Sequence, residues 1–555
     1  MSKEENKDQK EKDKKDFIVT PWDVSGSIDY NKLIEKFGTQ LIDQQLLDKF
    51  KKVTGKELHP WLKRGIYFTH RALDNFLDAY AAGEPVFLYT GRGPSTEAMH
   101  IGHLIPFIFT KWMQDTFNCP LVIQISDEEK AAFKHVEFES LHKMGFENAK
   151  EIISCGFDVK KTFIFSNRDY RLACPKYENF TSDFKNNTSI KSIQSIFGLN
   201  EKGNIFMYDW PVYQSVAAFW QAYPHIFGSR PAVCCVPHAI DQDPYFRLAR
   251  DVAAKMNLIK PTNIMCTFIP PITGQDGKMS SSKADATLFL TDDKETVTKK
   301  IMTLCKGGNG NINEDIAYEY LRYFEMDDNK LETIKNDYIS GKLSDEGIKK
   351  ILIEKLWELM SEIQNNRKKI DDKLLKEYYE LKPIELPKPK MKEVIPEEKE
   401  LYDLLDKFGI KHETKYHAVI TTIDQFEDLE RKINGTICKG LLLKAKEGYI
   451  YYIINEHTNV NIKLLAKSLK LKVLRFAEGD TYQQMLKVHS KTCPSIFAIK
   501  NDNEQKIIKV LIDENIEKTK NVCSLAMRED GTCSIEYSDL LKYLKELNYE
   551  VQNVQ

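Results

Sequence analysis

The chain has 555 residues, enough for about three or four domains at roughly 100 to 200 residues per domain. Apolar residues make up 42% and charged residues 29% of it, a composition typical of a globular protein. Its 80 Lys and Arg against 82 Asp and Glu give a net charge of −2, which excludes a uniformly basic coat and leaves only local basic patches for nucleic acid.

Membrane insertion, export and a structural metal are all disfavoured by the sequence. No apolar run approaches the ~20 residues of a membrane span, and the N-terminus has neither an apolar signal core nor an Arg-rich, acid-poor presequence. The eleven cysteines are scattered without a CxxC pair, so neither a disulfide framework nor a zinc site is indicated. We therefore expect a cytoplasmic protein with reduced thiols, no membrane contact and no structural metal.

A charged tail precedes the folded part of the chain. Residues 1–16 hold six basic and six acidic side chains and almost nothing that could be buried, so we predict that they are disordered. The alternative is a lysine-rich arm that helps to hold RNA, although the acids cancel its field. From Phe17 onward, apolar and aromatic residues reach the density of a folded chain, and residues 17–80 form the next segment.

Residues 81–295 have the alternation of an α/β domain. Residues 86–90 have the apolar run of a buried strand, a Gly/Pro turn follows, and residues 99–115 are predicted as a helix. Strands that alternate with helices indicate a Rossmann-type, doubly wound parallel sheet. Because ligands of such sheets bind at the carboxyl ends of the strands, we expect the chemistry in the loops after Thr90, Ile125 and Val236. Further strands are predicted at residues 121–125, 163–165 and 233–236.

Two more folded regions follow. Long amphipathic helices, such as one over residues 347–369, predict a helical domain at 296–382. Residues 383–396 contain four prolines, a density typical of a semi-rigid linker. Short strands at 440–444 and 449–454 then indicate a separate α+β domain over residues 397–555. The apolar stripe expected on helix 347–369 consists of Ile348, Ile351, Leu352, Leu356 and Leu359.

The segment His100-Ile-Gly-His103 stands at the predicted start of the first helix, directly after a strand and a turn. A helix N-terminus carries partial positive charge and free N–H groups that suit phosphate. Gly102 lets a flat base approach the backbone, and the two histidines, three apart, share one helical face. This arrangement favours a nucleotide; two ordinary histidines beside a core helix are the alternative.

A second segment, Lys278-Met-Ser-Ser-Ser282, lies in a loop rich in Gly and Ser that is suited to a mobile clamp on triphosphate. In this order and about 175 residues apart, the two segments resemble the HIGH and KMSKS signatures of class I aminoacyl-tRNA synthetases, although the second lysine is absent. The resemblance implies attack by an amino-acid carboxylate on the α-phosphate of ATP, followed by transfer to the tRNA 3′ end.

Residues 89–112, 122–130 and 239–247 narrow this resemblance to the eukaryotic cytosolic enzymes of the class that are specific for tryptophan, over residues 17–382. It implies ATP with Mg²⁺, tRNA(Trp) and L-tryptophan as partners, residues 17–80 as a cap on the active site, and residues 296–382 as the anticodon-binding domain. It also implies a homodimer formed through an insertion at about 135–230. The implied catalytic residues are His100, His103 and Lys278, and the ATP contacts are Arg92, Gly102, Lys278, Met279, Ser280, Ser281 and Ser282.

The indole ring has one polar group, a donor-only N–H, so a selective pocket needs a buried acceptor in an apolar slot. By resemblance, Tyr89 and Gln124 supply it, and Glu129, Gln214 and Gln242 bind the α-ammonium. Such a site rejects phenylalanine, because the acceptor would stay unpaired. A tyrosine-specific enzyme would instead want a carboxylate for the phenol, and a non-catalytic synthetase-like RNA-binding protein is the third reading. Basic residues that either contact tRNA or form a solvated face are Lys349, Lys350, Arg367, Lys368 and Lys369.

The C-terminal region carries a second resemblance. Residues 404–410, 438–443, 461–466 and 511–513 are similar to the YbaK/ProX family, whose members hydrolyse misacylated tRNA. Lys439 matches the lysine that is essential in that family, which implies a possible editing site. The family's glycine-containing loop is present only as Lys491-Thr-Cys-Pro-Ser495, without its glycine. A catalytically silent tRNA-binding module is the alternative.

Overall fold

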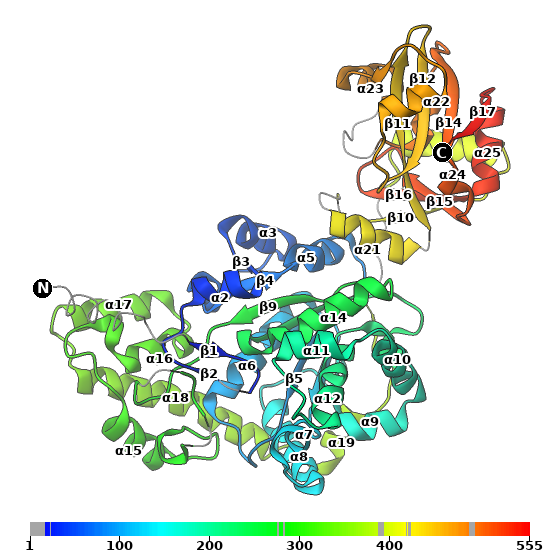
Figure 1. Cartoon of the computed structure of the whole chain (residues 1–555). Helices are drawn as coiled ribbons and strands as arrows, with labels where there is room; N and C mark the ends of the chain where they lie inside the picture. Colours follow the sequence, from blue (N-terminus) through cyan, green and yellow to red (C-terminus); the bar gives the residue numbers. More distant parts are fainter. Residues whose placement is uncertain are drawn as a thin grey trace, which may run out of the picture. The chain divides into compact units, whose positions relative to one another are not determined.

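The computed structural model describes residues 17–22, 24–274, 277–280, 283–386, 393–417, 419, 423–433, 435–487 and 494–554. The predicted disordered tail, Ser281, Ser282, part of the proline-rich linker and residues 491–493 lie outside the described residues. The chain forms two compact units: the first consists of residues before 388, and the second of residues 388–555 together with 81–84 and 257–259. In Figure 1 the first runs from blue to green and the second from yellow to red.

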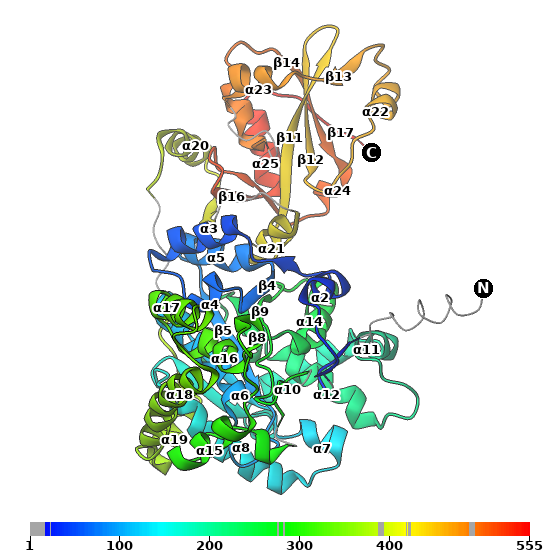
Figure 2. The same cartoon turned by 90° about the vertical axis from the view of Figure 1, so that its left-hand side faces the viewer.

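Within the described residues, the first unit is built on a seven-stranded sheet in the order β3-β4-β9-β8-β5-β6-β7. The strands β9, β8, β5, β6 and β7 are parallel, and their apolar runs are almost completely buried, which confirms the predicted parallel core. Figure 2 shows β4, β9, β8 and β5 as neighbours. The strands are β3 (Gln40–Leu41), β4 (Tyr67–Arg71), β5 (Val86–Arg92), β6 (Leu121–Ile125), β7 (Thr162–Ser166), β8 (Val233–Ala239) and β9 (Thr262–Cys266).

The N-terminal segment adds an edge to this sheet that the sequence did not predict. Strand β4 pairs antiparallel with β9, and the two-residue β3 pairs antiparallel with β4. A side chain also links these two strands: the Thr69 hydroxyl of β4 donates to the carbonyl oxygen of Gln40 in β3 at 2.6 Å. The segment also holds β1 (Ile18–Val19), β2 (Val24–Ser25), α2 (Tyr30–Phe37), α3 (Gln44–Thr54), α4 (Pro60–Lys63) and α5 (Leu73–Ala82).

Helices connect the parallel strands. After β5, the helix α6 spans Ile101–Phe117, two residues later at each end than predicted, because His100 is its N-cap and Asn118 ends it in the left-handed region. Between β6 and β7 lie α7 (Glu129–Lys134) and α8 (Phe138–Ile153). The remaining helices are α9 (Asn167–Ala173), α10 (Pro175–Asn186), α11 (Ile190–Phe197), α12 (Ile205–Val216) and α13 (Pro224–Phe227) before β8, and α14 (Asp243–Lys255) after it.

The helical region that follows contains the long helix α18 (Asp345–Arg367), which begins earlier than predicted because the Ser344 hydroxyl caps it by accepting from the Gly347 N–H. The predicted apolar stripe is partly wrong: Ile351 and Leu359 are only half-buried, whereas Met360 and Ile363 are buried. Four of the six buried positions, Ile348, Leu352, Leu356 and Met360, are therefore four residues apart. The other helices are α15 (Lys294–Leu304), α16 (Ile316–Phe324), α17 (Asp328–Ile339) and α19 (Asp372–Tyr379).

The second unit contains, among its described residues, an eight-stranded mixed sheet in the order β10-β16-β15-β11-β12-β14-β17, with β13 also paired to β11. The two predicted strands are present and longer, as β11 (Thr436–Ala445) and β12 (Tyr449–Asn455). The others are β10 (Glu413–Tyr416), β13 (Leu474–Phe476), β14 (Ile507–Asp513), β15 (Asn521–Leu525), β16 (Gly531–Glu536) and β17 (Val551–Val554). Its helices are α20 (Pro396–Lys407), α21 (Ile423–Ile433), α22 (Ile462–Ser468), α23 (Gly479–Leu486), α24 (Glu514–Glu517) and α25 (Tyr537–Glu546).

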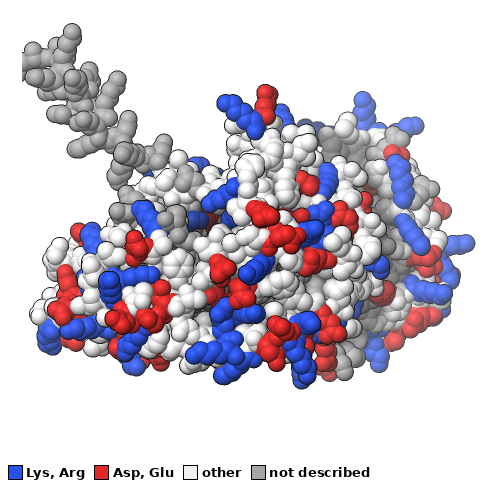
Figure 3. All heavy atoms as spheres, turned by 90° about the horizontal axis from the view of Figure 1, so that it is seen from below, with Lys and Arg blue, Asp and Glu red and all other residues white. Residues whose placement is uncertain are grey.

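The described residues contain neither a membrane-spanning helix nor a cluster of metal ligands. No helix there is long and apolar enough to cross a membrane. No group of three or more His, Cys, Asp or Glu side chains there could hold a metal ion. On the face shown in Figure 3, basic and acidic side chains are interspersed and neither forms a continuous field, in keeping with the net charge of −2.

Candidate active site

A cavity of about 540 Å³ opens at the carboxyl ends of the parallel strands, within the usual size range for a small-molecule site. Its walls are formed by strand β5, the start of α6, α7, α12, the β8–α14 connection and the loop that contains Lys278. Among the predicted site residues, those that line it are Tyr89, Arg92, His100, Gly102, His103, Glu129, Gln214, Gln242, Lys278, Met279 and Ser280.

Of the described residues predicted to bind tryptophan or ATP, Gln124 alone does not line this cavity. Gln124 lies behind Tyr89 and is fully buried. Ser281 and Ser282 are outside the described residues.

The two histidines of the first signature lie against each other at the start of α6. Their ring centres are 3.5 Å apart, and the backbone N–H of His100 donates to His103 Nδ1 at 3.3 Å. Burial, with the nearby Arg92 cation, lowers the pKa of His100 to about 3 and that of His103 well below its usual range. Both rings are therefore neutral, and they offer hydrogen bonds to a nucleotide rather than positive charge.

Arg92, the last residue of β5, lines the cavity and has one unsatisfied donor. Its Nε donates to Asn148 Oδ1 at 3.1 Å, while its Nη2 is buried with no hydrogen-bond partner among the described residues. Burial lowers the pKa of the guanidinium to about 10, so it stays cationic at neutral pH. A buried, unpaired N–H of a cation suits a phosphate oxygen.

At two glycines of this site the backbone lies so close to neighbouring side chains that there is no room for a Cβ atom. A Cβ on Gly102 would lie 2.9 Å from Ile269 Cγ2 and 3.1 Å from His100 Nδ1. A Cβ on Gly93 would lie 2.2 Å from Glu129 Oε2, so a side chain there would displace the carboxylate that was predicted to bind the ammonium. Gly93 was recognised from the sequence only as part of a turn.

Lys278 of the signature loop is held by an acid that the sequence analysis did not select. Its Nζ lies 2.5 Å from Oδ2 of the buried Asp241 and 5.5 Å from the centre of the Phe268 ring. Asp241 belongs to the segment 239–247 that carried the resemblance, and this was the only signal for it. The Lys278 side chain is one-third exposed, so a more negative ligand such as triphosphate could draw its ammonium away from Asp241.

The other end of the cavity is lined by amides and aromatic rings. The Tyr89 hydroxyl donates to Gln124 Oε1 at 2.7 Å, and Gln214 Nε2 donates to Gln242 Oε1 at 3.0 Å. Burial raises the pKa of Tyr89 well above its ordinary value, so this hydroxyl stays neutral. The carboxylate of Glu129 accepts from Lys130 Nζ at 3.0 Å.

An aromatic pair borders the cavity from the N-terminal segment. Trp22 stacks on Phe133 of α7 with ring centres 4.4 Å apart, and both residues line the cavity. This contact places part of the segment 17–80, expected to cap the site, at its wall.

The basic cluster of the helical region is largely engaged within the protein. Lys350 pairs with Glu346 at 2.7 Å, and Arg367 pairs with Glu147 at 2.5 Å. Lys368 donates to the side-chain oxygen of Asn365 at 3.4 Å. Contact of this cluster with tRNA stays a prediction.

In the second unit, Lys439 lies on β11, and its Nζ donates to the Glu456 carbonyl oxygen at 3.0 Å and to Glu456 Oε1 at 3.2 Å. The described end of the predicted editing loop is close by, because the Gly440 N–H donates to the Pro494 carbonyl oxygen at 2.9 Å. Residues 491–493 of that loop lie outside the described residues. Glu456 had no sequence signal, since it follows a strand as an ordinary surface acid would.

Each of the two units matches a known protein family. Residues 81–361 match the family described as tRNA synthetases class I (W and Y), and residues 417–543 match the aminoacyl-tRNA editing domain. The cytoplasmic tryptophan–tRNA ligase of Oryctolagus cuniculus is 42% identical over 382 residues, which cover 66% of this chain and 80% of the relative. The corresponding enzyme of Arabidopsis thaliana is 39% identical, covering 68% of this chain and 98% of the relative.

Solved structures give the same result. The tryptophanyl-tRNA synthetase of Encephalitozoon cuniculi bound to tryptophan is 36% identical with a TM-score of 0.59, and the match covers 64% of this chain and all of that one. A parasite tRNA synthetase with bound product is 39% identical with a TM-score of 0.61, and the match covers 64% of this chain and 97% of that one.

Proposed function

Because this chain belongs to the tryptophan and tyrosine family of class I tRNA synthetases, we infer that it is a tryptophan–tRNA ligase. It activates L-tryptophan with ATP to tryptophanyl-adenylate and transfers the tryptophanyl group to tRNA(Trp). The observation that carries the substrate is the Tyr89 hydroxyl at the cavity wall, whose proton goes to Gln124 and whose oxygen is left to accept the indole N–H.

The rival readings fit the cavity less well. A tyrosine-specific site would need an acid for the phenol, but the two acids that line this cavity, Glu129 and Asp241, are each paired with a lysine. A non-catalytic protein would not need to keep the first signature, Arg92 and Lys278 around one cavity. Both observations favour the ligase.

The proposed reaction depends on positioning and electrostatics. The tryptophan carboxylate oxygen attacks the α-phosphorus, the new C–O–P bond forms, and the bond to pyrophosphate breaks. His100 and His103 hydrogen-bond the phosphates as neutral rings, and the Arg92 guanidinium adds a fixed positive charge. Lys278 leaves Asp241 and balances the charge that grows on the leaving pyrophosphate. Ser280 to Ser282, with Met279 and Gly102, complete the proposed ATP site.

Mg²⁺ belongs to this proposal only as an ion carried by the phosphates of ATP. The described residues offer no cluster of three side chains that could hold a metal, and the two carboxylates of the cavity already pair with lysines. When bound, the ion would neutralise the departing pyrophosphate.

Ammonium binding is assigned to Glu129, Gln214 and Gln242. All three line the cavity together with Tyr89, and the Gln214 carbonyl oxygen is 3.3 Å from the Tyr89 hydroxyl, so the indole end and the amino end are adjacent. A single glutamine amide would be an ordinary polar group. The Gln214–Gln242 pair, however, offers amide oxygens in the same cavity as the Glu129 carboxylate, which suits a cation.

Aminoacylation tests this proposal directly. Full-length protein is incubated with ATP and either tRNA(Trp) with labelled tryptophan or tRNA(Tyr) with labelled tyrosine. We expect acid-precipitable label only in the first reaction. Charging of tRNA(Tyr) with tyrosine, or no charging in either reaction, would overturn the assignment.

The C-terminal unit contains an aminoacyl-tRNA editing domain, and its activity is part of the proposal: it hydrolyses a small amino acid from mischarged tRNA. Lys439 is the expected key residue, because a fixed ammonium can hold the carbonyl or phosphate of the terminal ester while water attacks. The test is deacylation by the full chain of tRNAs carrying alanine, serine, proline or cysteine. Turnover that Lys439→Ala abolishes supports editing; no turnover leaves a tRNA-binding module.

A homodimer formed through residues 135–230 is also proposed. This segment exposes three large apolar side chains that a dimer interface could cover: Ile205 is 88%, Leu172 77% and Ile190 67% exposed. Light scattering after size-exclusion chromatography should give twice the 64.4 kDa mass of the chain. A monomer at micromolar concentration would contradict the dimer.

The domain limits and the location complete the proposal. We assign residues 81–295 to catalysis, 296–382 to anticodon binding and 397–555 to the editing domain, joined by the linker 383–396. A cytoplasmic location is carried over from the printed names of the relatives.

A further inference from the structure

The direction of one hydrogen bond decides what the tryptophan pocket can accept. A tyrosine hydroxyl accepts from an indole N–H only if its own proton points elsewhere. Here the Tyr89 proton goes to Gln124 Oε1, 2.7 Å away. If the Gln124 amide were flipped, its NH₂ would donate to the Tyr89 oxygen, and the hydroxyl proton would turn to the Gln214 carbonyl oxygen, 3.3 Å away. The Tyr89 oxygen would then be occupied by the amide and no longer free to accept from an indole N–H.

Gln124 is kept in the useful orientation by what lies behind it. Its Nε2 donates to Asn167 Oδ1 at 3.0 Å and to the Tyr213 carbonyl oxygen at 3.2 Å, so both amide hydrogens have acceptors. Gln124 and Asn167 are both fully buried, where an unpaired amide is costly. The Gln124 orientation therefore depends on Asn167 also presenting its oxygen rather than its NH₂.

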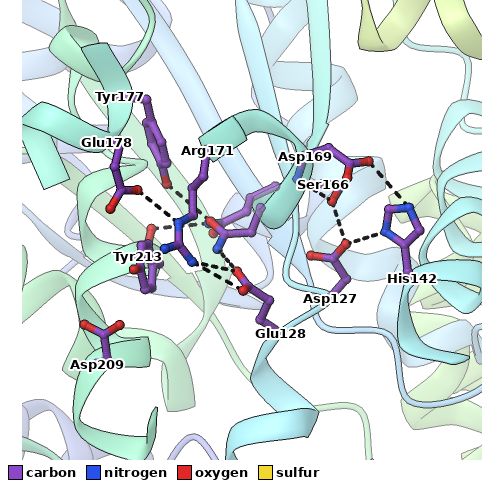
Figure 4. A network of polar contacts seen from close by, with 12 residues as sticks. Asp127, Glu128, His142, Ser166, Asp169, Arg171, Tyr177, Glu178, Asp209 and Tyr213 are labelled. Atoms are coloured by element: carbon purple, nitrogen blue, oxygen red, sulfur yellow. Dashed lines mark hydrogen bonds and ion pairs between the residues drawn. The ribbon is translucent and has the colours of Figure 1, made fainter. Parts of the chain in front are cut away.

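Asn167 is oriented in turn by charge. Its Nδ2 donates to the carboxylate of Glu128, which can only accept when ionised, and its Oδ1 also accepts from the Tyr177 hydroxyl at 3.3 Å. Glu128 is held by Arg171, whose Nη1 lies 3.3 Å from Glu128 Oε1. Figure 4 shows Arg171 between Glu128 and Glu178, with the Tyr213 ring beside it.

The order of groups is thus cation, carboxylate, amide, amide and phenol. Arg171 is fixed by Glu178 at 3.0 Å and by the Tyr213 ring, 4.2 Å from its guanidinium carbon. The direction of the links is set at the Arg171 end, because the guanidinium can only donate and the ionised Glu128 carboxylate next to it can only accept.

We propose that Asn167 is a positioning residue that sets the hydrogen-bond direction of the amino-acid pocket, so that Tyr89 offers a lone pair to substrates with a ring N–H and rejects isosteric rings without one. The inference rests on the proposed activation of tryptophan and deepens it. Asn167 does not touch the substrate; it acts through Gln124 and Tyr89.

A substrate pair separates this role from a merely structural one. In β-(3-benzothienyl)alanine a sulfur replaces the indole N–H, so the ring keeps its shape but has no donor. General damage to the pocket lowers kcat/KM for both substrates alike, whereas loss of hydrogen-bond direction lowers it for tryptophan alone. The readout is the ratio of the two kcat/KM values in pyrophosphate exchange with full-length protein.

In the unchanged protein this ratio should clearly favour tryptophan. Asn167→Ala should lower it about tenfold or more, the scale of an unmet buried polar group. Asn167→Asp should keep it, because the carboxyl shares a proton with Glu128 and still offers Gln124 an acceptor. Tyr177→Phe is the matched control: it removes a donor from the same Asn167 oxygen without disturbing Gln124, so its ratio should stay within about twofold.

An unchanged ratio in folded Asn167→Ala, or a ratio near one in the unchanged protein that still activates tryptophan, overturns the inference and leaves the ligase intact. If Asn167→Ala does not fold, the milder Asn167→Asp decides, and loss of the ratio there overturns the inference. Absence of any tryptophan activation by the unchanged protein refutes the proposed function instead.

Discussion

Glu151 is a buried acid next to the first signature, and it makes the stability of the catalytic unit depend on pH. It lies on α8 with no exposed surface, and its Oε2 accepts from the N–H of Met99 at 2.7 Å. Its Oε1 is buried with no partner among the described residues. Burial raises the pKa of this carboxyl from 4.5 to about 7. We predict that Glu151→Gln stabilises the protein at alkaline pH.

The sign and size follow from this pKa. A carboxyl with a raised pKa in the folded state contributes stability that is fully present below about 4.5 and is lost as the pH rises through 7. At about 1.4 kcal/mol for each pH unit between the two values, ionising Glu151 costs up to about 3.5 kcal/mol above pH 7. Glutamine stays neutral and keeps a carbonyl acceptor for Met99, so the variant avoids this cost.

Thermal unfolding of full-length protein at pH 5 and pH 8 measures the effect. The variant should melt near the unchanged protein at pH 5 and a few degrees above it at pH 8. Glu147→Gln is the control: this acid is on the same helix, one-third exposed, and paired with Lys150 and Arg367, so it should gain nothing at pH 8. Equal melting shifts at both pH values for Glu151→Gln would refute the reasoning.

Four further predictions concern the site and the two units. Tyr89→Phe should weaken tryptophan activation by about 1 to 3 kcal/mol in kcat/KM, because the indole N–H loses its acceptor; unchanged kinetics in the folded variant would disprove the pocket. Lys278→Ala should slow activation in rapid-quench assays far more than it weakens tryptophan binding, since its contact strengthens as charge develops; an effect on affinity alone would count against it. The hydrogen bond to Asp127 raises the pKa of His142, so its stabilisation is full below pH 6.5 and fades at higher pH; His142→Phe should therefore lower the melting temperature more at pH 5.5 than at pH 8.5, and the reverse order would be inconsistent with this pair. A chain ending at Lys382 should still activate tryptophan, because the first compact unit is nearly complete there; loss of exchange in that folded chain would show dependence on the second unit.

Local patterns in the sequence were sufficient for the parallel strands and for the nucleotide end of the site. Buried strands such as β6 are continuous apolar runs, and His100 and His103 stand where a helix start follows a strand, so spacing alone predicts their position. The two-residue strand β3 has no periodicity to detect. Its pairing with β4 depends on tertiary contacts.

The hydrogen-bond and ion-pair partners that tertiary packing brings to the site residues could not be predicted from the sequence. Asp241 holds Lys278, Asn167 holds Gln124, and Glu151 holds Met99, across separations of 37, 43 and 52 residues. Each looks like an ordinary helix or loop residue until the sheet brings the segments together. The direction of the hydrogen bond at Tyr89, on which substrate choice depends, is therefore a property of the fold.

Amino-acid-dependent pyrophosphate exchange with all twenty amino acids tests the central claim most directly. Full-length protein is supplied with ATP, Mg²⁺ and labelled pyrophosphate, and the formation of labelled ATP is followed for each amino acid separately. Tryptophan alone should support exchange well above background. The rates with tyrosine and phenylalanine should stay close to background. Faster exchange with tyrosine, or no exchange with any amino acid, would contradict the account.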